Sequence, residues 1–427
     1  MNSQLQVRRA YEKFLTFAGA SKLVLLHPAS RFRSLAVALL LADTRRKTYY
    51  YALDIDDINL FHFLTGLING LAKQHASFGR HLNVLPQNVL QDPYRHVDLV
   101  LKTFLDELAD FGDGDFILLL DEFDRADPAD DIHRFVERLS HLAPERCTIV
   151  LNGRSLPRLP WLSMMAKRHA VILRDDELIQ KDFYGKRNAK DASLKVLSLG
   201  PGYVFMDDRL VDNWEGHLPR LLLFFVMDRP EVTRNQICEV FWPDLHIDQA
   251  VNVFHVTKRR LHKALGVDIL SHDGTYYRIN PDVPFYFDAF EFVESLLLCR
   301  HGDLPDAFQH WQNVAKLYRG PFLQGHSDGW IEERRQAYSV ANTESLTQIA
   351  DNWSARGNDE LALLTLGKAI DADYSIEATH LKLLRLYVRL GRRAEAVAHY
   401  RDLEKWAKGK RRKLGVETRR LFTEITA

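Results

Sequence analysis

The sequence predicts a multidomain protein of the α/β plus α class, and three observations support this. The length of 427 residues suggests about three domains of roughly 150 residues each. Short apolar runs alternate with helical stretches in the first part, and a helical repeat occupies the last. Between them lies a shorter part with helices and a hairpin signal. We therefore expect domains at 1–185, 194–290 and 291–427, with a polar linker at 186–193.

The composition is that of an ordinary globular protein, with 46% hydrophobic and 27% charged residues. Its 24 Phe and 7 Trp exclude a disordered chain. Lys and Arg together number 57, as do Asp and Glu, so overall charge does not attract nucleic acid, although a local basic face could. Cys147, Cys238 and Cys299 lie too far apart for a disulfide framework or a cysteine zinc site, so we expect no metal and a reducing compartment.

The longest apolar runs are too short to cross a bilayer. Leu35–Ala42 and Leu221–Met227 fall far below the ~20 residues that a membrane helix needs. The first residues have no apolar core behind their charges and do not read as a secretory signal. We therefore expect a cytoplasmic protein without membrane contacts.

Four apolar runs in the first part are strand candidates. They are Leu23–Leu26, Tyr49–Asp54, Phe116–Glu122 and Cys147–Gly153. The stretch Ser34–Ala42 predicts a helix after the first of them. Continuous apolar runs separated by helices indicate parallel strands that are covered on both faces.

The third of these runs resembles a Walker B strand, because it is apolar and ends in Asp121 and Glu122. In such a site the Asp would hold a Mg²⁺ water shell and the Glu would polarise an attacking water. A buried strand that merely ends in acids explains the same residues. The Walker A segment is the stronger evidence on whether this strand belongs to a nucleotide site.

The segment after the first strand departs from the Walker A pattern G-x-x-x-x-G-K-[ST]. Its key positions hold His27, Phe32, Arg33 and Ser34, so both glycines are missing. Those glycines let backbone N–H groups wrap the phosphates, whereas Phe32 would fill that space. We expect a degenerate P-loop-like fold with no ATPase activity and no cofactor, and nucleotide binding stays open as the less favoured alternative.

The order of these strands is similar to that of the signal-transduction ATPases with numerous domains (STAND class). In that class a sensor arginine follows the strand after Walker B, and here Asn152-Gly153-Arg154 ends that strand. The resemblance covers roughly the first 180 residues and implies a vestigial nucleotide site. Its residues would be Arg33, Ser34, Asp121, Glu122 and Arg154.

The middle part contains a basic amphipathic helix over Asp248–Leu265, which we expect Asp248 to cap and Gly266 to close. At 3.6-residue periodicity one face is apolar and turns inward. The other face would neutralise phosphates and read bases, since Arg can bind guanine and Asn adenine. An ordinary solvated helix face is the alternative. The polar face carries Asn252, His255, Lys258, Arg259, His262 and Lys263, with Arg260 at its edge.

The neighbours of this helix favour the DNA-binding interpretation. Two helices precede it and the Asp273-Gly274 turn signal follows it, which is the order of a winged helix-turn-helix. The two strand-like runs ahead of the helices, 193–199 (SLKVLSL) and 203–206 (YVFM), resemble the response-regulator type of winged helix. Residues 237–244 (ICEVFWPD) and 258–266 (KRRLHKALG) resemble sequence blocks of bacterial activators, although His262 replaces the usual Arg. The resemblance implies a helix in the major groove and a wing, Ile269–Ile279, in the neighbouring minor groove. Arg278 and Arg234 are further candidate DNA contacts.

The last part carries a repeat of 34 residues, the tetratricopeptide period. The matched pairs are Trp353 with Tyr387, Gly357 with Gly391, Ala362 with Ala396, and Leu366 with Tyr400. Ahead of the repeat, residues 318–323 (YRGPFL) and 328–335 (DGWIEERR) resemble the bacterial transcriptional activator domain of SARP-type activators. That family implies a sequence-specific transcriptional activator that works with duplex DNA and RNA polymerase, with two protomers on direct repeats.

Two alternatives remain open at this point. In one, the chain is a nucleotide-switched, STAND-like regulator whose first domain binds ATP or another nucleotide and gates DNA binding. In the other, it is a protein scaffold built on the repeats, and the basic helix is incidental.

Overall fold

The computed structural model describes residues 11–12, 15–16, 21–30, 33–93, 95–112, 114–173, 192–301 and 307–426. Most of the predicted linker, 186–191, lies outside these residues. The chain divides into two compact units, of which the first comprises Met1–Val196 and Val204–Phe287 and the second Leu197–Tyr203 and Asp288–Ala427. We call residues 21–173 the N-terminal segment, 192–287 the central segment and 288–426 the C-terminal segment.

The N-terminal segment is built on a five-stranded parallel sheet with the order β2-β3-β4-β1-β5. The strands are β1 (Leu23–Leu26), β2 (Lys47–Ala52), β3 (Phe116–Asp121), β4 (Cys147–Asn152) and β5 (Ala170–Leu173). The expected parallel sheet is confirmed, and the four predicted strands lie within two residues of their expected ends. The apolar run of β5 was missed.

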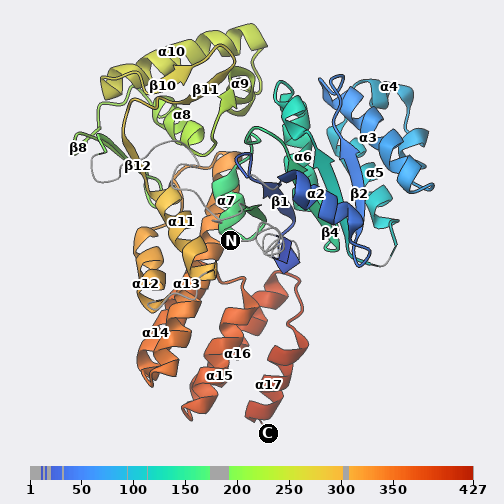
Figure 1. The fold of residues 1–427 in the computed structure, drawn as a ribbon. Helices are drawn as coiled ribbons and strands as arrows, with labels where there is room; N and C mark the ends of the chain where they lie inside the picture. The colour runs from blue at the N-terminus through green and yellow to red at the C-terminus, as the bar shows by residue number, and fades with distance from the viewer. Residues whose placement is uncertain are drawn as a thin grey trace, which may run out of the picture. The chain divides into compact units, whose positions relative to one another are not determined.

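Helices pack on this sheet (Figure 1). Val37 and Leu40 of one helix, α2, pack on Val24, Leu119 and Val150 of the strands. The helical elements are α2 (Arg33–Ala42), α3 (Leu60–Gln74), α4 (Gln87–Gln91), α5 (Val97–Ala109), α6 (Asp130–Leu142) and α7 (Trp161–Ala166), with 3-10 turns η1 (Leu82–Val84) and η2 (Phe123–Ala126). Since α6 packs against both α3 and α5, the segment encloses a core of its own.

The central segment combines three helices with two small sheets (Figure 1). The helices are α8 (Leu218–Met227), α9 (Arg234–Phe241) and α10 (Ile247–Leu265). One sheet has the order β12-β6-β7-β8, with β6 (Leu194–Leu197), β7 (Tyr203–Met206), β8 (Arg209–Leu210) and β12 (Phe285–Phe287). The other has the order β10-β11-β9, with β9 (Val232–Thr233), β10 (Leu270–His272) and β11 (Tyr276–Ile279). The predicted hairpin at Asp273-Gly274 is confirmed as the β10–β11 turn, where Gly274 has φ +101°.

The predicted cap of the basic helix is wrong by two residues. His246 is the N-cap of α10, since its carbonyl accepts the first helical hydrogen bond, from Ala250 N at 3.0 Å. Asp248 lies instead in the first turn, where its charge favours the positive end of the helix dipole. The C-terminal end is as expected, because Gly266 closes the helix with φ +73°.

The C-terminal segment consists of helices packed in sequence order (Figure 1). They are α11 (Asp288–His301), α12 (Ala307–Leu317), α13 (Gly329–Ala355), α14 (Asp359–Ala372), α15 (Glu377–Arg389), α16 (Arg393–Gly409) and α17 (Val416–Thr426). The predicted repeat is present, since Gly357 and Gly391 turn α13 into α14 and α15 into α16 with φ of +76° and +71°. Ala362 and Ala396 are fully buried where those helices meet. Among the residues described, no helix is both long and apolar enough to span a membrane.

Candidate nucleic-acid interface

The apolar side of α10 faces the core of the central segment, as predicted. Phe254 and Leu261 are fully buried on it, and α8 and α9 both pack against the helix. The ring of Phe254 meets Tyr277 of β11 edge-on, with centroids 5.0 Å apart. This contact joins the helix to the hairpin, and it leaves the opposite side of α10 facing outward.

The outward side carries the predicted polar residues. The exposed ones are Asn252, His255, Arg259, Arg260, His262 and Lys263, while Lys258 is half-buried. Within the described chain, the side chains of Asn252, Arg259 and His262 make no hydrogen bond or ion pair. Their donors and acceptors are therefore available to a ligand that approaches this side of the helix.

Three other cations of α10 are held by nearby groups. Lys263 and Arg260 both pair with Glu215, the latter at 3.5 Å. The hydrogen bond from Lys263 lowers the pKa of the Glu215 carboxyl. Lys258 lies 3.9 Å from Asp268 and 5.5 Å from the ring centre of Tyr277. These contacts hold cationic side chains beside the open face of the helix.

The hairpin and the start of α9 carry the remaining predicted DNA contacts. Arg278 on β11 is exposed and lies 3.5 Å from Glu231. Arg234 is exposed at the first position of α9. The turn is held by Asp273, whose carboxylate accepts hydrogen bonds from the backbone of Thr275 and Tyr276, and these bonds lower its pKa.

Predicted nucleotide residues lie at the carboxyl edge of the N-terminal sheet, and several of their polar atoms bind protein groups. Asp121 accepts hydrogen bonds from Tyr50 Oη at 2.9 Å, from Asn152 Nδ2 at 2.7 Å and from Glu122 N at 2.8 Å. Burial, with the bond to Asp121 as a further cause, raises the pKa of Tyr50 to about 12. A carboxylate with three internal donors has little capacity left for a metal water shell.

The cations of this edge also bind protein groups. Arg33 donates to the carbonyl of Gly153, and Arg154 lies 4.0 Å from Glu122. Ser34 is exposed, while Phe32 lies outside the described residues. Sequence reasoning missed Tyr50 and Asn152, although Asn152 ends a strand at the same edge.

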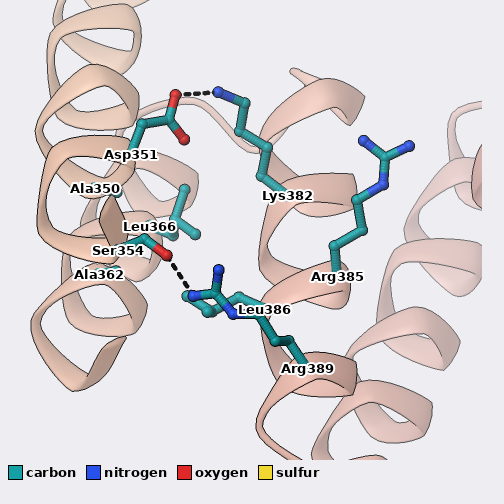
Figure 2. Close-up of a pocket in the computed structure, with 9 residues that line it drawn as sticks. All are labelled: Ala350, Asp351, Ser354, Ala362, Leu366, Lys382, Arg385, Leu386 and Arg389. Carbon is teal, nitrogen blue, oxygen red and sulfur yellow. Dashed lines mark hydrogen bonds and ion pairs between the residues drawn. The ribbon is translucent and has the colours of Figure 1, made fainter. Parts of the chain in front are cut away.

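A groove of about 200 Å³ lies between α13, α14 and α15 (Figure 2). Lys382 and Arg389 of α15 cross it to Asp351 and Ser354 of α13, and Arg385 between them pairs with Glu417 of α17. Each cation thus has a partner on a neighbouring helix. We conclude that Lys382 and Arg389 join the two repeats to each other, while Arg385 joins the second repeat to α17.

Comparisons with known proteins support one part of the chain. Residues 287–426 match the family described as bacterial transcriptional activator domain, which confirms the resemblance expected for the C-terminal segment. No curated protein matches the chain.

Two solved structures show distant similarity. Mycobacterium tuberculosis EmbR, solved in complex with a low-affinity phosphopeptide, aligns with a TM-score of 0.46 and 19% identity over 55% of this chain and 65% of that one. A STAND protein with a tetratricopeptide repeat sensor from Pyrococcus horikoshii aligns with a TM-score of 0.24 and 12% identity, over 97% of this chain and 66% of that one. This chain spans less than two thirds of either.

Proposed function

We propose that this chain is a sequence-specific DNA-binding transcriptional activator, in which the central segment is a winged helix and α10 enters the major groove. The observation that carries the proposal is the two-sidedness of α10. Its apolar side packs against α8, α9 and the hairpin. Its other side presents Asn252 and Arg259, whose side chains make no hydrogen bond or ion pair with any residue that the structure describes. A bacterial transcriptional activator domain follows directly in the chain.

The basic and polar side chains fall into two groups, those that would contact phosphates and those that would contact bases. In this proposal phosphates are neutralised by Lys258, Lys263, Arg234 and Arg278, which gives affinity without sequence preference. Arg259 would bind the O6 and N7 acceptors of guanine, and Asn252 the N6 and N7 atoms of adenine. Sequence preference therefore rests on the exposed middle of α10.

Activation would follow from the C-terminal segment. Once α10 is bound, this segment would contact RNA polymerase beside the promoter, and two protomers would occupy a direct repeat. The proposal assigns no catalysis and no cofactor to the chain. The N-terminal segment, a degenerate P-loop-like domain, acts through protein contacts in this account.

The test is operator selection followed by single substitutions. The full chain would be used to select duplexes from a random library, and Arg259→Ala and Lys258→Ala would then be compared on the selected site. We expect Arg259→Ala to cost about 10- to 100-fold in affinity and to relax preference at one base pair. Lys258→Ala should weaken binding to all sequences alike.

The control is Arg80→Ala, which removes an exposed arginine from the N-terminal segment and should leave binding unchanged. If the library yields no preferred sequence, or if Arg259→Ala binds as the wild type does, the repeat-scaffold alternative is favoured and the proposal is wrong.

A further inference from the structure

The N-terminus of α9 is organised to hold an anion. Thr233 caps the helix, accepting a hydrogen bond from Gln236 N at 3.1 Å, while Gln236 Oε1 accepts one from Thr233 N at 3.0 Å. The remaining N–H groups of the first turn and the helix dipole favour negative charge at this end. Arg234 adds an exposed guanidinium there.

The hairpin contributes two more donors on the same side. Tyr276 is the register partner of Thr233 across β11 and β9, so their side chains are neighbours on one face of the small sheet. Arg278, two residues along β11, points to that face as well. Tyr277, between them, is buried on the other face against Phe254. We call Thr233, Arg234, Tyr276 and Arg278 the wing-side cluster.

Two groups of the N-terminal segment, the Asp130 carboxylate and the Asp127 carbonyl, already bind two members of this cluster. The hydroxyl of Thr233 donates to Asp130 Oδ2 at 2.5 Å, and the phenol of Tyr276 donates to the carbonyl of Asp127 at 3.0 Å. Arg158, almost fully buried, binds Asp130 at 2.8 Å and stacks 4.9 Å from the ring centre of Tyr276. The Asp130 carboxylate at this end of α9 is thus also paired with Arg158 of its own segment.

Two ion pairs extend the same contact. Arg134 of α6 pairs with Glu239 of α9. Three residues along α6, Glu137 lies 3.7 Å from Arg229, and both of these side chains are largely buried. The charges therefore alternate across the contact, so exchanging the two charges on α6 would place like charges opposite each other at both pairs.

We propose that the wing-side cluster is a binding site for a backbone phosphate of duplex DNA, and that Asp130 occupies this site in the free protein. A phosphate oxygen accepts hydrogen bonds from hydroxyl, phenol, guanidinium and helix N–H groups. In the free protein the Thr233 hydroxyl is bound to Asp130 and the Tyr276 phenol to the Asp127 carbonyl, so a phosphate would have to displace both. One anion excludes the other, so the N-terminal segment and DNA compete for the central segment. The inference rests on the proposed function and adds a site and an internal competitor to it.

Competition has a measurable consequence. DNA reaches the wing-side cluster only in those molecules in which the N-terminal segment has left it. The apparent affinity for DNA is therefore the intrinsic affinity multiplied by the fraction of such molecules. Weakening the contact between the segments should therefore tighten DNA binding, even when no residue of the central segment is changed.

The experiment uses the full chain with Arg134→Glu and Glu137→Arg together, which preserves the net charge of α6. Affinity for a fluorescein-labelled 30-base-pair duplex of mixed sequence would be measured by anisotropy in low salt. We expect binding about three- to tenfold tighter than wild type, the order of one or two ion pairs. Hydrogen exchange in residues 230–240 should rise in parallel.

A rescue variant separates release from altered charge. Arg134→Glu alone should tighten binding, and adding Glu239→Arg should restore the pair and return affinity toward wild type. If the new arginine at 239 acted directly on DNA, the double variant would bind tighter still. That result, or faster exchange without tighter binding, would overturn the competition.

The phosphate site itself is tested in the charge-exchanged background. There Thr233→Val and Tyr276→Phe should each weaken DNA binding about two- to fivefold, since each removes one donor to a charged acceptor. Thr233→Ser, which keeps both the cap and the hydroxyl, should bind as its parent does. Unchanged binding by Thr233→Val and Tyr276→Phe would overturn the site.

Failure of this inference and failure of the proposed function look different. If Arg259→Ala weakens DNA binding, but the charge exchange and the hydroxyl variants leave it unchanged, only the inference is overturned. If neither the wild type nor the charge-exchanged chain binds the duplex in low salt, both are overturned.

Discussion

The phenol of Tyr50 donates a hydrogen bond to Asp121 across neighbouring strands, with 2.9 Å between Oη and Oδ2. Asn152 and the backbone of Glu122 donate two more hydrogen bonds to this carboxylate, so three of its roughly four acceptor sites are taken. Protein groups would therefore compete with a nucleotide-bound Mg²⁺ for Asp121 at this edge of the sheet.

From this competition we expect that ATP with Mg²⁺ does not stabilise the chain. A ligand that binds only the folded state raises the unfolding temperature in proportion to RT ln(1 + [L]/Kd). We expect no change at saturating nucleotide in a thermal unfolding experiment. A rise of several degrees would support the nucleotide-switched alternative, and its loss in Asp121→Ala would locate the site.

Glu215 should restrain DNA binding, because it pairs with Lys263 and Arg260 beside the open face of α10. Glu215→Gln removes one negative charge near the expected phosphates and releases both cations. We expect affinity in low salt to rise about two- to fivefold. Glu395→Gln, the same charge change at an exposed site of α16, is the control and should have no effect. An equal rise in both variants would contradict the role given to Glu215.

Acid should destabilise the N-terminal segment through His133. Burial, with the charge of Arg158 as a second cause, lowers the pKa of this histidine to about 3. The unfolded chain therefore takes up a proton between about pH 6.5 and pH 3 that the folded chain does not, so stability falls as pH falls through this window.

The size of this effect follows from linkage. It amounts to at most about 2 kcal/mol of unfolding free energy between pH 6.5 and pH 5. His133→Gln should flatten the pH dependence of urea unfolding over that range, while His62→Gln, at an exposed position, should not. Equal slopes in wild type and His133→Gln would disprove the assignment.

The turn glycines of the repeat should be sensitive to a methyl group. Gly391 has φ +71° with open space around its Cβ position, so only backbone strain opposes alanine there. We expect Gly391→Ala to reduce the unfolding free energy by about 1 kcal/mol. Gly367, inside α14 and equally open, should gain about 0.5–1 kcal/mol as Gly367→Ala. Chemical denaturation of the two variants would show opposite signs, and a shared sign would refute the argument.

Much of the fold could be predicted because its signals are local. The 3.6-residue pattern of α10 identifies its buried side, and the Asp273-Gly274 pair identifies the hairpin. The spacing of Gly357 and Gly391 identifies the repeat. The first two signals depend on side chains that are close in sequence, and the third on a regular internal spacing, so none of them requires knowledge of distant contacts.

The rest depends on contacts between residues that are far apart in the chain. Tyr50 and Asp121 are 71 positions apart, and Asp130 and Thr233 are 103 apart, so no spacing rule connects them. The start of α10 was misplaced because Asp248 favours both a cap and a first turn, and the local backbone decides between them. The predicted DNA contacts on α10 lie on one face, but their role stays a prediction.

The salt dependence of DNA binding by the full chain tests the central claim most directly. If Lys258, Lys263, Arg234 and Arg278 contact phosphates, the logarithm of affinity for the selected operator should fall linearly with the logarithm of salt concentration, with a slope of about −4. Arg234→Ala should reduce that slope by about 1. Affinity that does not change with salt would contradict the account.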